Sequence, residues 1–238
     1  MIKDIKKEKA FTLAETLITI GIIGVVVAFT LPTLINKYKA AELKNSLYKE
    51  YSILSQAITN MITNTGYETY TSNNNREDAN NFMSTLMQEY SKPYYNCYSD
   101  KEAKFCIGGE LNREDGTWLT TLYKNFTGNK SNESYINDGR YMLKNGACIF
   151  LDMSSPNKNY LLSIDVNGMR KKPNKFGHDL FMFELNKENG KLIPEGAPNT
   201  ILEDETEYCS EKSTSTYNGL GCTAKALRDP DYFNKIIK

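Results

Sequence analysis

The chain has 238 residues, with 29 basic and 29 acidic side chains, so it has no net charge when its single histidine is neutral. A neutral chain has no general attraction for nucleic acid, and any such binding would have to rest on a local basic patch. The sequence also contains no Gly-rich phosphate loop and no HExxH motif, which excludes the commonest signatures of phosphoryl-transfer enzymes and zinc proteases.

The N-terminal 35 residues have the most informative pattern. Residues 1–10 contain four lysines and two acidic residues, and this charge of +2 favours a cytoplasmic location for the leader. Residues 16–35 follow as twenty residues without a charge, long enough for a helix to cross a hydrocarbon core of about 30 Å. Glu15 stands at the start of this run, where burial of a carboxylate is costly and calls for a partner.

The segment Lys-Ala-Phe-Thr-Leu-Ala-Glu before the apolar run resembles the N-terminal processing signal of type IV pilins and of type II secretion pseudopilins. The resemblance implies that a prepilin peptidase cuts between Ala10 and Phe11 and then methylates the Phe11 amine. It further implies that Glu15 of one subunit pairs with the Phe11 amine of its neighbour and so sets the register of a filament. Ala10 is a departure, because this family usually has Gly before the cut.

Alternatives to each of these interpretations stay open. A secretory signal peptide shares the basic leader and the apolar run, although here the Ala-Phe site precedes the run. Glu15 would in the alternative view simply lie at the lipid–water interface. Gly24 and Pro32 match offsets at which the family has Gly and Pro, which implies a helix that loosens in the filament. A plain proline kink in a membrane helix is the competing explanation.

Helical periodicity continues beyond Ile35, but residues 36–62 are amphipathic. The apolar positions recur at helical spacing and are Leu43, Leu47, Leu54, Ile58, Met61 and Ile62. One helix from Phe11 to Met61 would be roughly 75 Å long, too long to be buried in a 238-residue globule. Residues 11–35 are therefore expected in lipid or against other subunits, while residues 36–62 pack on a domain.

Residues 63–238 are expected to form an exported α+β domain of pilin-like architecture, with an antiparallel sheet packed across the long helix around one hydrophobic core. Helices are predicted over 76–90 and 118–126, and strands over 140–144, 147–152, 160–166, 180–185 and 191–193. Asn145-Gly146 predicts a two-residue hairpin turn. Residues 91–138 and 195–222 are predicted to be irregular insertions, and residues 195–238 a polar tail.

Five cysteines suit an oxidising, exported location. Two pairs can be chosen from five cysteines in fifteen ways, so the sequence leaves the connectivity open. Cys97 with Cys106, and Cys209 with Cys222, would each close a short loop and stabilise the fold by roughly 2–3 kcal/mol. Cys148 lies in an apolar strand and is expected to be a buried free thiol. A zinc site is disfavoured because the chain has no CxxC motif.

The second suggestive stretch is residues 163–179. Asp165, Asn167 and Gly168 have the alternation of oxygen ligands and glycine that opens a calcium loop, and Asn174 and Asp179 could complete the oxygen shell. The EF-hand spacing then fails, because lysines occupy the middle of the loop and no glutamate closes it. An Asx turn that joins two strands is the favoured alternative.

The same loop carries four basic residues: Arg170, Lys171, Lys172 and Lys175. Competence pilins bind DNA through such patches, and contacts to phosphate need little more than positive charge. A solvated loop is the favoured interpretation of this patch in a neutral protein.

The sequence thus predicts a non-enzymatic structural subunit of a type IV pilus-like filament or a type II secretion pseudopilus. It would cross the cytoplasmic membrane once, with its N-terminus in the cytoplasm and its domain outside, before assembly. The partners implied by the resemblance are other pilin subunits, prepilin peptidase, and the assembly platform and ATPase. Calcium is the only cofactor that the sequence suggests. The alternatives are a DNA-binding minor pilin and an exported domain tethered by an uncleaved anchor.

Overall fold

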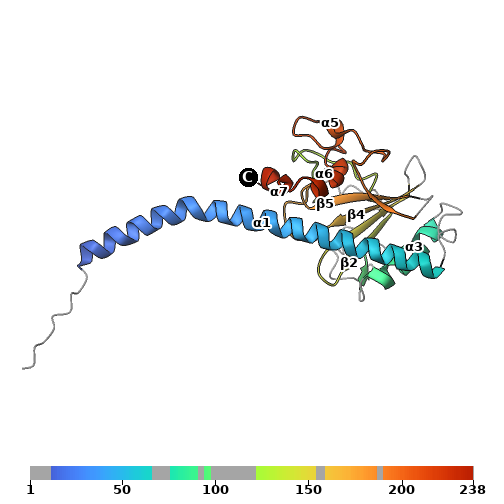
Figure 1. Ribbon diagram of the computed structural model, residues 1–238, viewed down its shortest axis with the longest axis horizontal. Helices are drawn as coiled ribbons and strands as arrows, with labels where there is room; N and C mark the ends of the chain where they lie inside the picture. The colour runs from blue at the N-terminus through green and yellow to red at the C-terminus, as the bar shows by residue number, and fades with distance from the viewer. Residues whose placement is uncertain are drawn as a thin grey trace, which may run out of the picture.

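The computed structural model describes residues 12–65, 76–90, 94–97, 122–153, 159–186 and 190–237. Its dominant element is α1 (Leu13–Thr65), a single helix of 53 residues that protrudes from the rest of the chain and enters it in one gentle curve (Figure 1). The prediction of one long N-terminal helix is confirmed, and the helix continues past Met61 to Thr65.

The second half of α1 packs on the domain through one face. Its buried side chains are Ala40, Leu43, Leu47, Leu54, Ala57, Ile58 and Met61, each at most 6% exposed. Their spacing of three and four residues places them on one side of the helix, as the amphipathic pattern predicted. A second helix, α3 (Arg76–Tyr90), packs beside α1 and buries Phe82 and Leu86 fully.

The sheet is an antiparallel meander in which each strand pairs with its neighbours along the chain. Its strands are β1 (Tyr94–Asn96), β2 (Gly139–Leu143), β3 (Cys148–Asp152), β4 (Tyr160–Asp165), β5 (Leu180–Leu185) and β6 (Leu192–Pro194). The five predicted strands are present within one or two residues, and the Asn145-Gly146 turn joins β2 to β3. The short strand β1 was not predicted, because three residues give too little periodicity to recognise.

The sheet is buried on both faces, whereas the sequence was expected to form one core. On one face Leu162, Phe183 and their neighbours pack against α1 and α3, and Tyr51 of α1 stacks on Phe183 with ring centroids 5.3 Å apart. On the other face a separate cluster contains Phe150, Leu161 and Met182. The reason is visible in β3 to β5, where every side chain is buried, a pattern typical of a strand covered on both sides.

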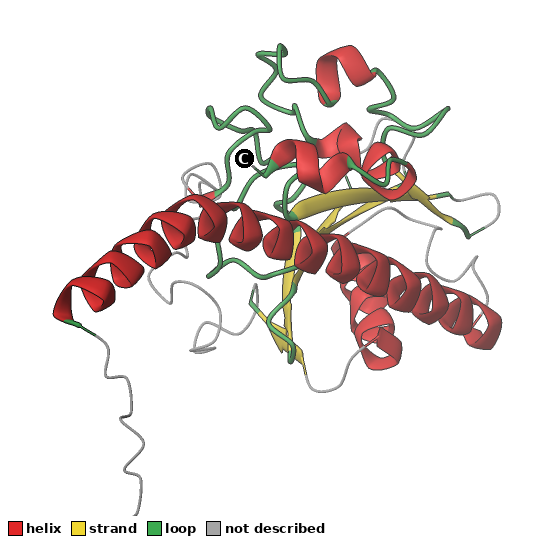
Figure 2. Ribbon diagram, turned by 60° about the vertical axis from the view of Figure 1, so that its left-hand side comes forward, coloured by secondary structure: helices red, strands yellow, loops and turns green. Residues whose placement is uncertain are grey.

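The prediction that residues 195–238 form a polar tail is wrong for the part of this segment that the structure describes. This region forms four short helical elements: α5 (Glu205–Tyr208), the 3₁₀ turn η1 (Leu220–Cys222), α6 (Thr223–Arg228) and α7 (Tyr232–Ile236). Leu220, Ala226 and Phe233 are at most 1% exposed. Helices α6 and α7 lie on the same side of the sheet as α1, which crosses in front of the strands (Figure 2). A few well-placed apolar residues therefore suffice to anchor a mostly polar segment.

The short helix predicted over 118–126 ends earlier than predicted. Leu122 is helical, residues 118–121 lie outside the described part of the chain, and residues 123–126 are not helical. Lys124 has extended backbone instead and forms bridges to Lys130 and Lys175. Its N–H donates to the Asn174 carbonyl over 3.0 Å, and its own carbonyl accepts from the Phe176 N–H over 2.9 Å. These long-range backbone bonds replace the local ones that a helix would make.

Candidate functional site

The N-terminal half of α1 is an apolar surface that contacts none of the described parts of the domain (Figure 1). Its most apolar window has a mean hydropathy of 2.4 and no buried residue. Leu13, Leu17 and Phe29 are 81%, 63% and 78% exposed. By length and composition this helix could cross a membrane. So large an exposed apolar area is unfavourable in water and is typical of a surface that lies in lipid or against another protein.

Glu15 belongs to a capping box at the start of α1. Its Oε2 accepts hydrogen bonds from the backbone N–H and from the hydroxyl of Thr12, both over 2.9 Å. In return, the Glu15 N–H donates to the Thr12 hydroxyl oxygen over 3.2 Å. The Thr-x-x-Glu pattern in the sequence is typical of the start of a helix, and it is the local signal that could have located the first turn of α1. Ala10 and Phe11, the predicted cleavage and methylation residues, lie outside the described residues.

Three threonines of the apolar half satisfy their hydroxyls within the helix. Thr16, Thr19 and Thr30 donate to carbonyl oxygens of the preceding turn, over 3.2, 3.0 and 2.9 Å respectively for the bonds that span four residues. A hydroxyl that is bonded in this way is much less costly to place in hydrocarbon or in a dry interface. These polar side chains are therefore compatible with an apolar environment around the helix.

Gly24 and Pro32 lie inside α1, which is helical through both positions. A side chain added at Gly24 would meet no atom within 4 Å, so the domain does not require glycine there. The predicted loosening concerns an assembled filament, and it stays a prediction for this single chain.

Asp165, Asn167 and Asp179, the predicted calcium ligands, lie close together in the connection between β4 and β5. Asp165 Oδ1 accepts from the N–H groups of Asn167 and Gly168, over 3.3 and 2.8 Å, and its Oδ2 accepts from the Tyr123 hydroxyl over 2.5 Å. The two oxygens of Asp179 accept from the N–H groups of Asn174 and Lys175, both over 2.7 Å. The structure thus brings the predicted residues together in an Asx turn.

This arrangement fits a bound cation poorly. All four carboxylate oxygens already accept hydrogen bonds, and among the described residues no three His, Cys, Asp or Glu side chains are grouped to hold a metal ion. Burial raises the pKa of Asp165, and the nearby charge of Asp179 raises it further. Burial also raises the pKa of Asp179. The raised pKa values indicate that a proton, held by one of the two carboxyls, relieves the repulsion between them.

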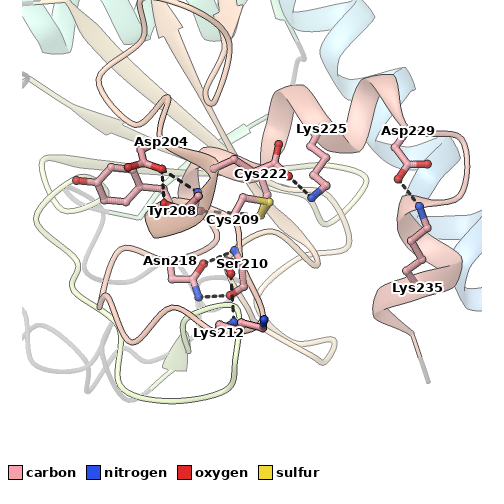
Figure 3. A network of polar contacts seen from close by, with 12 residues as sticks. Asp204, Tyr208, Cys209, Ser210, Lys212, Asn218, Cys222, Lys225, Asp229 and Lys235 are labelled. Atoms are coloured by element: carbon pink, nitrogen blue, oxygen red, sulfur yellow. Dashed lines mark hydrogen bonds and ion pairs between the residues drawn. A yellow bond between two sulfur atoms is a disulfide. The ribbon is translucent and has the colours of Figure 1, made fainter.

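The cysteines and the histidine have structural environments. Cys209 and Cys222 form a disulfide that joins α5 to η1, as predicted, beside the polar contacts of Asn218 with Ser210 (Figure 3). Cys97 is disulfide-bonded, and its predicted partner Cys106 lies outside the described residues. Cys148 is the buried free thiol that was predicted, and burial raises its pKa to about 12, so it is unreactive.

His178 is held inside the fold. Its Nε2 lies 3.1 Å from the Phe126 carbonyl oxygen, and its ring packs against the Phe126 ring with centroids 4.9 Å apart. Burial, together with the charge of Lys175, lowers its pKa to about 4, so the ring is neutral at physiological pH. A histidine with this partner acts as a packing group.

No protein family, no characterised protein and no solved structure matches this chain.

Two buried acidic sites were missed by sequence reasoning. Glu50, in the middle of α1 and 2% exposed, accepts from the Tyr90 hydroxyl of α3 and, over 2.8 Å, from Asn145 Nδ2 in the β2–β3 turn. Glu184 of β5 and Glu195 after β6 form a buried carboxyl pair. The pattern alone favours solvent exposure for these residues, since glutamates are seldom buried.

Proposed function

We propose that this chain is a structural subunit of a type IV pilus-like filament or a type II secretion pseudopilus, and that it assembles through the N-terminal half of α1. The main support for the proposal is that α1 is one continuous helix whose two halves have different surroundings. Residues 40–61 are locked into an α+β domain, while the apolar half before Ile35 has no partner among the described residues. A helix of this kind presents its apolar half to lipid before assembly and to other copies afterwards.

The position of Glu15 supports the same proposal. Its carboxylate is held at the very start of the apolar half by the Thr12 cap, one helical turn from where a Phe11 amine would stand after cleavage. Burying a carboxylate in a helix bundle is unfavourable without a cation, and the amine of a neighbouring subunit would supply one. The capping box also gives Glu15 a second role that needs no neighbour, and a test must separate the two roles.

The first experiment is co-expression of the full chain with a prepilin peptidase, followed by mass spectrometry of the mature N-terminus. A methylated Phe11 terminus is expected, and Ala10→Gly is expected to be processed at least as completely. An intact leader would contradict the proposal and favour an exported domain tethered by an uncleaved anchor. A cut after Ile35 would favour a secreted protein.

The second experiment separates charge from capping. Glu15→Gln keeps an acceptor for the Thr12 N–H, because Gln also completes a capping box, but removes the negative charge. Thr12→Ala keeps the charge and removes the hydroxyl of the cap. Filament formation in the presence of the assembly machinery is expected to fail for Glu15→Gln and to persist for Thr12→Ala. The reverse outcome would show that Glu15 serves the helix start and not the filament register.

A further inference from the structure

The apolar half of α1 joins the domain without a spacer. The apolar run ends at Ile35, and the first helix side chain buried by the domain is Ala40, which is 3% exposed. Five residues of helix correspond to about 8 Å along the axis. If the apolar half lies in a membrane, the edge of the domain beside residues 36–43 therefore lies at the depth of the lipid headgroups.

A groove of about 470 Å³ lies at this edge of the domain, which we call the basic groove. It lies between α1, the connection from β4 to β5, and the C-terminal end of α7 with the residue that follows it. Its charged lining consists of Lys39 from α1, Lys171, Lys172 and Lys175 from the connection, and Glu42 from α1. The basic patch that sequence analysis found in one loop is thus completed by a lysine more than 130 residues earlier in the chain.

The basic groove has a strong excess of positive charge. Glu42 is its one carboxylate, and it faces Lys171 at 4.0 Å with both side chains well exposed, so this ion pair is weak. His178 also lines the groove and is neutral at physiological pH. Lys171 and Lys172 are exposed to solvent.

The basic groove also has apolar walls. Leu43, Pro173, Ile236 and Ile237 line it next to the lysines. One turn or less before Ala40, Tyr38 is 71% exposed on α1, and Lys37 beside it is exposed as well. An exposed tyrosine with flanking lysines at the end of an apolar helix is typical of the membrane–water interface.

We propose that the basic groove binds the headgroup of an anionic phospholipid in the membrane that α1 enters. The lysines would contact the phosphate, and the apolar walls would cover the glycerol and the first acyl carbons. The positive charge of the groove favours an anionic phosphate ligand, and the level of the groove on α1 favours a lipid over DNA, because a bilayer at this level would keep a duplex away. This proposal rests on the membrane-spanning part of the proposed function and does not depend on cleavage, filament assembly or sidedness.

The test uses the full chain in nanodiscs of phosphatidylcholine, with and without phosphatidylglycerol, and measures amide hydrogen exchange over residues 36–43 and 167–175. Phosphatidylglycerol is expected to slow exchange in both segments at low salt, and added salt should weaken the effect. Each lysine near the headgroups should account for about a fivefold change in lipid affinity. The double variant Lys171→Gln/Lys172→Gln should therefore lose most of the protection.

The matched control is Lys191→Gln/Lys212→Gln, which removes the same charge from exposed positions that do not line the groove. This control should respond to phosphatidylglycerol as the unmodified chain does. Equal exchange in both kinds of nanodisc would overturn the proposal, as would equal losses in the two double variants. Protection by duplex DNA without any effect of phosphatidylglycerol would also overturn it and assign the groove to nucleic acid.

Failure of this proposal is distinguishable from failure of the proposed function. If the chain enters nanodiscs but phosphatidylglycerol does not change its amide hydrogen exchange, only the lipid site is contradicted. A chain that does not enter nanodiscs contradicts the membrane-spanning segment, and the lipid site with it. Cleavage at Phe11 and the assembly of Glu15 variants are measured separately and are unaffected by either result.

Discussion

At the scale of single residues, the chain contains a buried carboxylate that holds three elements together. Glu50 of α1 accepts hydrogen bonds from Tyr90 of α3 and from Asn145 of the β2–β3 turn, with Lys49 Nζ 3.7 Å from its Oε1. A buried charge is tolerable only when its oxygens are bonded in this way. Glu50 therefore fixes how α1 lies across α3 and the sheet.

Tyr90→Phe is expected to lower the free energy of unfolding by about 1.5–3 kcal/mol, because it removes one donor from a buried charged acceptor. Tyr48→Phe is the matched control. The Tyr48 hydroxyl donates to the Leu227 carbonyl over 2.5 Å at a site that is 40% exposed, so water can replace it and the loss should be smaller. Denaturant unfolding measures both. Equal losses would show that Glu50 does not depend on Tyr90.

Two glycines in neighbouring turns, Gly168 and Gly146, differ in how much space surrounds them. Gly168 and Gly146 both have positive φ, +85° and +90°. A Cβ on Gly168 would stand 2.0 Å from the Gly146 carbonyl oxygen, whereas a Cβ on Gly146 would meet nothing within 4 Å. Both positions require a left-handed conformation, but only Gly168 also requires the absence of a side chain.

Gly146→Ala is expected to cost about 1 kcal/mol, the strain of a left-handed alanine. Gly168→Ala should cost clearly more, because the two turns must also separate. The free energies of unfolding from denaturant titration would test this order. A Gly168→Ala chain as stable as Gly146→Ala would mean that the two turns are not in contact in solution.

At the scale of elements, the carboxyl pair of Glu184 and Glu195 links β5, β6 and the C-terminal layer. Glu184 Oε2 accepts from the Ile201 N–H over 3.3 Å, and Glu195 Oε2 accepts from the Leu202 N–H over 3.2 Å. Burial, and then the charge of Glu184, raise the pKa of Glu195 to about 8. The folded chain thus binds a proton here that the unfolded chain, with a pKa of 4.5, releases.

Because the folded pKa is the higher one, the contribution of Glu195 to stability is complete below pH 4.5 and is lost as the pH rises to about 8. Glu195→Gln is expected to remove this loss. Between pH 4.5 and about pH 8 the variant should therefore become more stable relative to the unmodified chain as the pH rises. Urea unfolding across the pH range measures the difference. The exposed control Glu207→Gln should show no such gain.

Other buried groups also contribute to the pH profile, so only the difference between the two chains isolates Glu195. Asp165 and Asp179 have raised pKa values and change stability in the same direction. His178 has a lowered pKa of about 4, so its contribution is present above pH 6.5 and is lost as the pH falls towards 4. A pH profile of Glu195→Gln parallel to that of the unmodified chain would contradict the carboxyl pair.

At the scale of the whole molecule, α1 divides into a half that folds the domain and a half that does not. None of the residues in its most apolar window is buried, whereas Ala40, Leu43 and Leu47 are at most 6% exposed. The domain should therefore be stable without the apolar half.

A chain that begins at Asn36 is expected to be monomeric without detergent and to keep the thermal midpoint of the full chain within about 3 °C, the shift equivalent to 1 kcal/mol for a domain of this size. A chain that begins at Lys44 is the control, because it also lacks Ala40 and Leu43, and it should melt earlier. Size-exclusion chromatography and thermal unfolding measure both. A large loss on starting at Asn36 would place part of the apolar half in the domain.

The amino-acid sequence alone is enough to predict the elements whose periodicity is long or whose turn residues are specific. The long helix, its change from apolar to amphipathic near Ile35, and the five predicted strands with the Asn145-Gly146 turn follow from local patterns. Such patterns can be recognised within a short segment of the sequence. They predict the structure correctly here because the apolar residues that define the pattern also form the buried face of the element.

Features that depend on residues far apart in the chain became apparent in the three-dimensional structure and not in the sequence. The second core on the far face of the sheet, the packed C-terminal layer, the burial of Glu50 and the completion of the basic groove by Lys39 all arise from contacts between distant segments. A polar residue is predicted to be exposed when only the sequence is known. Its burial becomes favourable when a hydrogen-bond donor from another element contacts it. Local sequence patterns therefore determine the helices and strands of this protein. Packing between distant segments determines which polar side chains of these elements come into contact.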